Sequence, residues 1–501
     1  MPRLSAVWAS RWGLLAAALA GLALPLAFAP FAQRWLALPA LAVLFAVTAA
    51  APPRRAALAA YLFGLGYMGL GVHWIYFSVS QYGGGALAAG LVTPLFILAF
   101  ALAPLAACLL GRRLAGGRPL LAAGLGLPLA WVAVEWIRGW LLTGATWLWV
   151  GYSQLDTPLA GLAPAIGALG LSLAVCLLAG AVAAALLAPS WLRAGAAVGL
   201  AALLAGAGML APGHWTHPAG EPLEVVLLQG NVSQDRKWNP RYYEWILGRY
   251  ARLTRDHLGA DLILWPEAAI PDWYHALDDE FLQPLAREVE AAGGELVVGA
   301  PVIEPDSGAA YNAVVGLTDP PQFYFKRHLV PFGEYVPLRD TLGGALDFVG
   351  VPLGDFDAGS SAAPLALKGT RIGVSICYEV TFGDEVAAAL PQAELLLNVS
   401  NDGWFGDSLA PHQHLEMARM RALETGRPML RATNTGVSAL IDHRGRVLER
   451  SPLFEPAALE GRVTPRQGAT PYVLWTDWPV VGVTFVGLLG VAAAAMRRGT
   501  P

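Results

Sequence analysis

The sequence predicts an α-helical transmembrane bundle of about eight spans that carries an inserted, extracytoplasmic α/β sandwich domain. Three observations predict this architecture. The 501 residues are 55% hydrophobic and only 14% charged, whereas an ordinary soluble protein has about 25% charged residues. The first 211 residues form successive apolar segments of about spanning length. The region that follows, up to residue 477, is polar and contains short β-rich runs between amphipathic stretches.

Eight apolar segments define the predicted spans. The start of the first resembles a cleaved signal peptide, but the many further spans favour an uncleaved helix. The predicted domains are therefore a bundle at 1–211, an insert at 212–477, and a final helix with its tail at 478–501. The segments lie at Trp12–Pro30, Trp35–Ala50, Ala56–Phe77, Ala86–Leu110, Pro119–Arg138, Leu159–Ala188, Trp191–Ala211 and Trp478–Met496.

Basic residues predict the topology. With eight spans, all but two of the arginines of the bundle fall on one side, and Arg34 and Arg138 are the exceptions. The positive-inside rule then makes both termini cytoplasmic and puts the insert on the outer face. The insert carries a net negative charge, which argues against nucleic-acid binding. The arginines on the predicted inner side are Arg3, Arg11, Arg54, Arg55, Arg112, Arg113, Arg118, Arg193, Arg497 and Arg498.

The insert has the alternating pattern of an α/β sandwich with helices over its sheets. Three amphipathic stretches are predicted helices: Pro240–Leu258, Asp278–Ala292 and His412–Thr425. The predicted strands are Leu223–Leu228, Leu262–Trp265, Glu295–Ala300, Ala313–Leu317, Gln322–Lys326, Arg371–Ile376, Leu395–Val399 and Gly436–Ile441.

Three chemically useful side chains follow predicted strands of the insert. Glu267 comes after Leu262–Trp265, Lys326 ends its own run, and Cys377 is the only cysteine of the insert. The other cysteines, Cys108 and Cys176, lie in predicted spans, where a packing role is expected. Each of the three residues alone has an ordinary interpretation as a turn acid, a solvated lysine or a core thiol. Their spacing alone leaves the choice open, because distance along the chain does not show adjacency in space.

Together, these segments resemble the nitrilase, or carbon–nitrogen hydrolase, superfamily. Its signature places glutamate, lysine and cysteine, in that order, at the ends of sandwich strands. Here they are Glu267 in Leu-Trp-Pro-Glu, Lys326 in Phe-Lys-Arg-His-Leu-Val-Pro-Phe-Gly-Glu, and Cys377 in Cys-Tyr-Glu. The predicted bundle narrows the resemblance to the apolipoprotein N-acyltransferase family. The further motifs that agree are Gln229–Asn231 with Lys237-Trp238, Gly333–Pro337, Asn398–Gly406 and His412–Arg427.

The resemblance implies a two-step acyl transfer in the bacterial inner membrane. A fatty acyl chain leaves a glycerophospholipid, typically phosphatidylethanolamine, and passes to the α-amine of the S-diacylglyceryl cysteine of an apolipoprotein. In this interpretation Cys377 is the nucleophile, Glu267 the general base and Lys326 the charge that stabilises the oxyanion. The chemistry runs from ester to amide through a thioester, so neither a cofactor nor a metal is expected.

Supporting roles also follow from the resemblance. Glu334 is implied as a second acid near the triad, although it could be a surface turn acid. Tyr378 and Glu379 are expected to orient the nucleophile, and Trp238 to contact substrate or simply to pack. The segment Asn401–Phe405 is expected to form a wall of the site.

Other signals are weaker. None of Lys237, Lys326 and Lys368 follows a glycine, which excludes a P-loop. His412, His414 and Glu416 lack the spacing of a zinc motif, so a structural role is favoured. Gly64, Gly66 and Gly69 match G-x-G-x-x-G but lie in an apolar span, where close helix packing is the better interpretation. Glu135 and Arg138 are either a functional pair or a pair that fixes the bundle.

Two alternative functions remain at this point. A membrane-tethered amidase or nitrilase would have the same triad but would transfer the acyl group to water. A transporter with an outer binding domain is the second alternative. It is disfavoured because the spans lack the several buried charges of an ion-coupled pathway.

Overall fold

The computed structural model describes residues 6–211, 213–335 and 355–497. Arg3, Pro212, Val336, Pro337 and Arg498, which the sequence interpretation used, lie outside these ranges. The chain divides into two compact units. The helical unit comprises Met1–Tyr76, Gly90–Pro212 and Trp475–Pro501, and the sandwich unit comprises Phe77–Ala89 and Gly213–Leu474.

Several helices have the length and composition of membrane spans. Among the described residues five qualify: Gly85–Leu114, Pro119–Arg138, Pro158–Leu187, Trp191–Met209 and Trp478–Met496. A sixth is added if α4 (Pro53–Gly71) and α5 (Ile75–Tyr82), bent by 54°, form one broken span. Two shorter apolar helices, Arg11–Ala27 and Arg34–Ala50, match the first two predicted segments. The count of eight spans therefore stays a prediction.

The predicted third segment, Ala56–Phe77, is not one continuous helix. It breaks after Gly71, and the sandwich unit begins at Phe77. The last turns of α4 contain Gly64, Gly66, Gly69 and Gly71, and each glycine lowers helix stability by about 1 kcal/mol relative to alanine. Three of these glycines, Gly64, Gly66 and Gly71, also allow close packing. A Cβ on Gly64 would meet the Ala101 carbonyl at 2.7 Å, and one on Gly66 would meet the Leu22 nitrogen at 2.8 Å. The predicted packing role is confirmed for Gly64 and Gly66, whereas a Cβ on Gly69 would meet no atom within 4 Å.

The Glu135 carboxylate accepts hydrogen bonds from two groups of the helical unit. It is buried in α9 (Leu127–Arg138), and its Oε1 accepts hydrogen bonds from Trp131 Nε1 at 3.0 Å and from the Val150 amide at 2.9 Å. These bonds tie α9 to the turn at Val150. The choice between a functional and a structural pair for Glu135 and Arg138 stays a prediction.

The sandwich unit contains two six-stranded sheets. The base sheet runs in the order β13-β2-β3-β4-β5-β6, and the cap sheet in the order β12-β11-β10-β9-β8-β7. A short antiparallel pair joins β1 (Thr216–Pro218) to β14 (Arg466–Gly468). The strands of the base sheet are β2 (Leu223–Gln229), β3 (Leu262–Leu264), β4 (Glu295–Ile303), β5 (Ala310–Gly316), β6 (Gln322–Phe325) and β13 (Ala457–Val463). Those of the cap sheet are β7 (Leu365–Leu367), β8 (Thr370–Ile376), β9 (Leu395–Ser400), β10 (Met429–Thr433), β11 (Ala439–Ile441) and β12 (Val447–Arg450).

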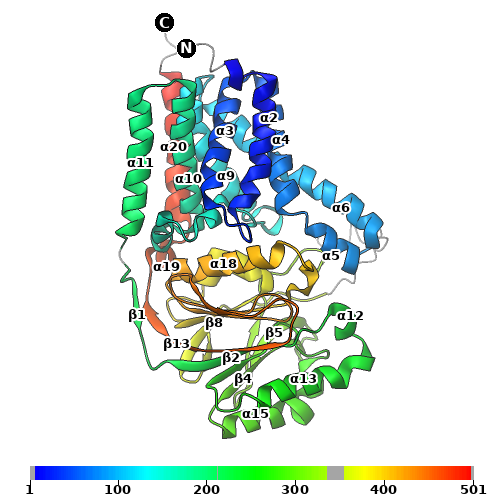
Figure 1. Ribbon diagram of the computed structural model, residues 1–501. Coiled ribbons are helices and arrows are strands. Elements are labelled where there is room, and N and C mark those ends of the chain that lie inside the picture. Colours follow the sequence, from blue (N-terminus) through cyan, green and yellow to red (C-terminus); the bar gives the residue numbers. More distant parts are fainter. Residues whose placement is uncertain (1–5, 212, 336–354, 498–501) are drawn as a thin grey trace. The chain divides into compact units, whose positions relative to one another are not determined.

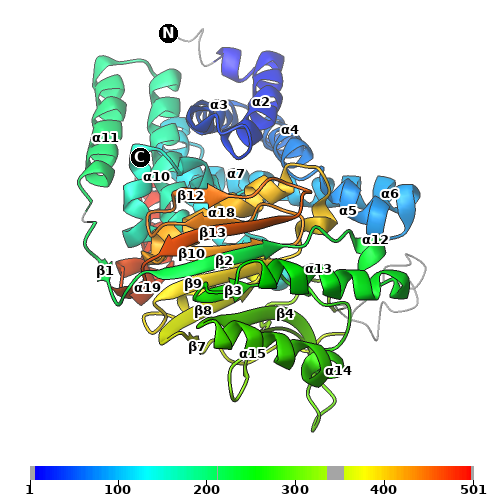
Figure 2. The same ribbon diagram turned by 60° about the horizontal axis from the view of Figure 1, so that its bottom comes forward.

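Helices cover the outer faces of both sheets, which gives four layers. In β2, Val225 and Leu227 face the core between the sheets, while Val226 and Leu228 face the helix layer, because successive side chains point to opposite faces. Figures 1 and 2 show α13 (Tyr243–Arg255) and α15 (Gln283–Ala291) on the base sheet, and Figure 1 shows α18 (Ala410–Thr425) over the cap sheet. The predicted α/β sandwich and its three predicted helices are confirmed.

Some strand predictions were wrong or incomplete. The run Gly436–Ile441 is a strand only from Ala439. The sequence interpretation missed the longer strands β10 and β13 and the short strands β1, β7, β12 and β14. Strand β10 contains Arg431, a charge that is atypical of a buried strand. Strand β13, Ala-Ala-Leu-Glu-Gly-Arg-Val, has a single β-branched residue, Val463, so it lacks the usual strand signal.

Candidate active site

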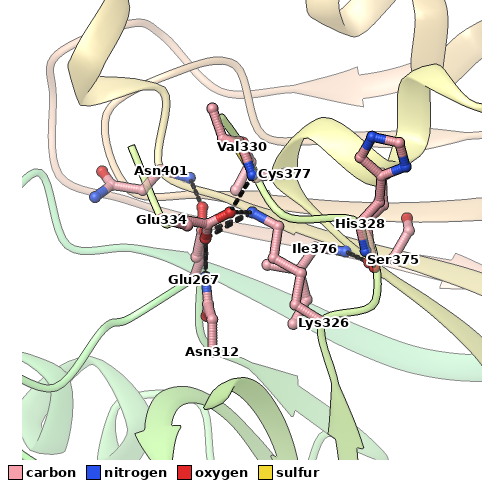
Figure 3. Close-up of polar contacts among 12 residues, drawn as sticks. Glu267, Asn312, Lys326, His328, Val330, Glu334, Ser375, Ile376, Cys377 and Asn401 are labelled. Atoms are coloured by element: carbon pink, nitrogen blue, oxygen red, sulfur yellow. Dashed lines mark hydrogen bonds and ion pairs between the residues drawn. The ribbon is translucent and has the colours of Figure 1, made fainter. Parts of the chain in front are cut away.

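The three predicted catalytic residues all follow strands of the sandwich. Glu267 lies three residues after β3, Lys326 directly after β6, and Cys377 directly after β8. Strands β3 and β6 belong to the base sheet and β8 to the cap sheet, so the site forms where ends of the two sheets meet. Figure 3 shows the head groups of Glu267 and Lys326 converging, with Cys377 beside them.

Lys326 lies between two carboxylates. Its Nζ is 2.8 Å from both oxygens of Glu334 and 3.7 Å from Oε1 of Glu267. Burial acts to lower the pKa of Lys326, but the charges of Glu334 and Glu267 outweigh burial and raise it. The lysine is therefore a fixed positive charge at neutral pH, which suits the stabilisation of an oxyanion.

Glu334 is not a surface acid, although it lies in a turn. Only 13% of its side chain is exposed, and its Oε2 accepts a hydrogen bond of 2.8 Å from the Val330 amide. This bond orients the carboxylate towards Lys326 (Figure 3). Of the two alternatives for Glu334, the geometry favours the acid that holds the lysine charge.

Asn312, which the sequence interpretation missed, bridges the two acids. Its Nδ2 donates to Oε1 of Glu267 at 2.8 Å and to Oε1 of Glu334 at 2.9 Å. The signal in the sequence was a polar residue inside the apolar strand β5, Ala-Tyr-Asn-Ala-Val-Val-Gly. The Asn401 amide supplies a further bond of 2.7 Å to Oε2 of Glu267. Glu267 is thus held through both oxygens, and the segment predicted to form a wall positions the candidate base.

Cys377 lies on a sharp turn between β8 and the 3₁₀ helix η10 (Cys377–Thr381). Its φ of 51° lies in the left-handed region, which a non-glycine residue adopts only where the surrounding structure holds it there. Burial, followed by the charge of Glu267, raises the pKa of the Cys377 thiol, while Lys326 opposes that rise. The resting thiol is therefore protonated at neutral pH and needs a base, for which the Glu267 carboxylate is available.

Glu379 ties two of the strand ends together. Its Oε2 accepts from the Ile376 amide at 2.6 Å and from Tyr324 Oη at 2.9 Å. Its Oε1 accepts from the Arg327 amide at 2.6 Å and the His328 amide at 3.1 Å. Because these groups flank Cys377 and Lys326, Glu379 fixes the two relative to each other. It is 1% exposed, and these four bonds use both of its oxygens.

The aromatic residues predicted near the site differ in their surroundings. The Tyr378 ring packs edge-on against Phe382 and His328, with ring centroids 5.1 and 5.8 Å apart. Trp238 is 56% exposed at the end of α12 (Gln234–Lys237). Tyr378 is therefore packed against its neighbours next to Cys377, whereas the Trp238 side chain is largely exposed.

Lys237 is a buried cation that the sequence interpretation did not place at the site. It is 2% exposed, and its Nζ lies 3.4 Å from the backbone oxygen of Glu267. Burial lowers the pKa of Lys237 to about 8, although the Glu267 charge opposes this shift. Folding therefore places a charged group in an unfavourable environment at neutral pH.

Replacing Lys237 with methionine is expected to stabilise the sandwich unit by about 3 kcal/mol at pH 7. Each pKa unit corresponds to about 1.4 kcal/mol, and the pKa falls from 10.5 to about 8. The cost of burying the charged Lys237 on folding is fully present below pH 8, where the folded chain also keeps the proton. This cost disappears as the pH rises to about 10.5, where the unfolded chain also loses its proton. Thermal unfolding of the wild type and of Lys237→Met at pH 7 and pH 10.5 measures this difference in stability. A pH-independent difference, or the same gain from Lys368→Met at a partly exposed lysine, would contradict this account.

No metal site is evident in the part of the chain that the structure describes. Within 6–211, 213–335 and 355–497, no group of three or more histidine, cysteine, aspartate or glutamate side chains could hold a metal ion. Of the weak candidates from the sequence, His414 is buried and bonded to Asp402. This histidine therefore contacts a carboxylate within the sandwich unit.

Comparisons with known proteins match both parts of the chain. Residues 20–181 match the family model of the apolipoprotein N-acyltransferase N-terminal domain, and residues 228–467 match the carbon–nitrogen hydrolase model. The chain is 47% identical to an apolipoprotein N-acyltransferase from Methylococcus capsulatus, over 97% of this chain and 96% of that protein. It is 43% identical to one from Azotobacter vinelandii, over 98% and 97% of the two chains. A solved CN-hydrolase superfamily protein from Xanthomonas campestris is 18% identical and covers 53% of this chain and 97% of its own, with a TM-score of 0.36.

Proposed function

This chain belongs to the apolipoprotein N-acyltransferase family and N-acylates lipoproteins, and we propose that the acyl group passes through a thioester on Cys377. The observation that carries the proposal is the buried cluster in which Lys326 lies between Glu267 and Glu334, next to the nucleophile turn. It combines a base, a fixed positive charge and a thiol in one site. The membrane-tethered amidase is not favoured.

The first half-reaction transfers the acyl chain from a phospholipid to the enzyme. Glu267 accepts the thiol proton, and Sγ of Cys377 attacks the ester carbonyl. The negative charge on the carbonyl oxygen develops near the Lys326 ammonium, which stabilises it. The C–O bond then breaks, Glu267 returns the proton to the departing glycerol oxygen, and a lysophospholipid leaves. We propose phosphatidylethanolamine as the donor, and Trp238 as a contact for the lipid.

The second half-reaction makes the amide. The neutral α-amine of the S-diacylglyceryl cysteine attacks the thioester carbonyl and transfers a proton to Glu267. The C–S bond breaks, and Glu267 protonates the sulfur as it leaves. The resting enzyme returns with its thiol protonated, as the raised pKa of Cys377 requires. Because one thiol serves both steps, the lysophospholipid must leave the catalytic centre before the amine arrives, which is a ping-pong cycle.

The decisive experiment follows a labelled acyl chain. Purified protein is incubated with phosphatidylethanolamine labelled in its acyl chains, without an acceptor. A label on the Cys377 peptide that hydroxylamine removes is expected, and a diacylglyceryl-cysteine peptide should then take it as an N-acyl amide. Parallel double-reciprocal lines should accompany this transfer. Release of the label only as free fatty acid would favour a hydrolase, and intersecting lines without an adduct would indicate direct transfer in a ternary complex.

The protein is a membrane protein, and we propose the inner membrane of a bacterium as its location. The sandwich unit would lie on the periplasmic side and both termini in the cytoplasm. The arginine distribution supports this arrangement. A reporter fused after Arg498 should then be cytoplasmic, while a tag inserted near Gly308 should be accessible from outside. If both were found on one side, an eight-span topology would be ruled out, since an odd number of crossings separates them.

A further inference from the structure

A buried charged cluster behind the nucleophile turn has no part in the proton transfers described above. It contains Arg431 of β10, His414 of α18, and Asp402 of the 3₁₀ helix η11 (Asp402–Phe405). Arg431 Nη2 donates to Oδ2 of Asp402 at 2.9 Å, and His414 Nδ1 lies 3.0 Å from Oδ1 of the same carboxylate. All three side chains are at most 1% exposed. Removing these charged groups from water costs free energy, so we expect the cluster to contribute to the site.

The cluster reaches the nucleophile through His414. Its Nε2 lies 3.1 Å from the backbone oxygen of Cys377. A carbonyl oxygen can only accept, so Nε2 carries the proton and donates it. When the ring is neutral, Nδ1 accepts from Arg431 Nη2 at 3.0 Å, and when the ring is charged, Nδ1 donates to Asp402. This bond holds the carbonyl side of the turn, while the Glu379 bond to the Ile376 amide holds the other side. Together they support the left-handed conformation of Cys377.

The charge state of Asp402 makes the support rigid. Burial acts to raise the pKa of Asp402, but the charges of Arg431 and His414 outweigh it and lower the pKa well below its usual range. The carboxylate therefore stays ionised at the pH of the reaction, and Ser400 Oγ adds a bond of 2.7 Å to it. Without changing its own protonation, Asp402 thus holds the Arg431 guanidinium, whose Nη2 lies 3.0 Å from Nδ1 of His414.

The same segment also holds the base. Asn401, the neighbour of Asp402, donates its amide to Oε2 of Glu267 at 2.7 Å. Two adjacent residues therefore orient the two reacting groups, Asn401 directly and Asp402 through His414. The chain also makes room for this arrangement, because a Cβ on Gly436 would come within 2.2 Å of Oδ2 of Asp402.

We propose that His414, fixed by Asp402 and Arg431, is a positioning residue that keeps Cys377 aligned with Glu267. The inference rests on the proposed nucleophile. Misplacing a reacting group by about 1 Å can slow a reaction about 100-fold. The expected signature is therefore a loss in kcat and in thiol reactivity, with little change in KM for the phospholipid.

The test compares two replacements of His414. His414→Leu removes the donor, whereas the amide of His414→Gln can still donate from the position of Nε2. We expect His414→Leu to lower kcat about 100-fold and to slow alkylation of Cys377 by iodoacetamide at pH 7, followed by mass spectrometry of its peptide. His414→Gln should recover most of both. The matched control is His412→Ala, two residues away on the same helix and half-buried, which should behave as wild type.

Three results would overturn the proposal. One is wild-type alkylation and turnover in folded His414→Leu. The second is an equal loss in the leucine and glutamine variants together with a lowered Tm, which indicates a purely structural role. The third applies if His414→Leu does not fold. Gly436→Ala, which displaces Asp402, is then measured instead, and alkylation of Cys377 at the wild-type rate in this variant would contradict the proposal. Alkylation needs no lipid, so these outcomes stand even if the wild type forms no acyl adduct and the proposed function fails.

Discussion

Replacing Cys377 with alanine is expected to abolish both the acyl adduct and N-acyl transfer, because no other thiol lies in the sandwich unit. Cys377→Ser should also fall below detection. A serine hydroxyl is far less acidic than a thiol, and burial with the neighbouring Glu267 charge already disfavours ionisation at this position. The measurement is acyl label on the protein and N-acyl product, with the Tm as the check of folding. Both variants should unfold near the wild-type temperature, since the side chain changes little in volume.

The other two cysteines supply the matched controls. Cys108 in α7 (Leu102–Leu114) and Cys176 in α10 (Ala163–Leu187) are buried in the helical unit. Cys108→Ala and Cys176→Ala should keep the adduct and the transfer activity. An adduct that persists in Cys377→Ala, or disappears in either control, would place the covalent step elsewhere.

The strands of the inner sandwich could be predicted because their sequences are continuous apolar runs. In β2 and β9 both faces are covered, so nearly every position is apolar, and this pattern is easy to recognise. Strand β10 was missed because Arg431 interrupts it. The partners of Arg431, Asn398 and Asp402, come from distant segments, and nothing local shows that they satisfy its charge.

The candidate catalytic residues could be proposed as a set from the sequence, but not the residues that hold them. Glu267, Lys326 and Cys377 each follow a recognisable strand, and the family resemblance connects them. Asn312 is different, because its role depends on the register between β5 and β6. That register pairs Ala313 with Phe325 and brings the Lys326 amide to the Asn312 carbonyl at 2.8 Å. The bond from His414 to Cys377 likewise depends on how α18 packs on the cap sheet. Such contacts follow from tertiary structure alone.

Replacing Lys326 with methionine is expected to reduce the rate of acyl transfer by about 100-fold to 1000-fold, the usual loss when one oxyanion donor is removed. It should also destabilise the sandwich unit by about 3–5 kcal/mol, because it breaks a buried ion pair by removing one partner. Glu267 and Glu334 would then face each other across the single amide of Asn312 without a counter-charge. The measurements are labelled acyl transfer and the shift in Tm.

A second substitution separates the two roles of the lysine. In Lys326→Met combined with Glu334→Gln, one of the two unpaired carboxylates is gone, so most of the lost stability should return. Activity should stay low, because no positive charge faces the developing oxyanion. Glu334→Gln alone should keep Lys326 paired with Glu267, which lies 3.7 Å away, and should therefore lose less activity than Lys326→Met. Recovery of both stability and transfer in the double variant would mean that Lys326 only neutralises its neighbours, and the oxyanion would then need another donor.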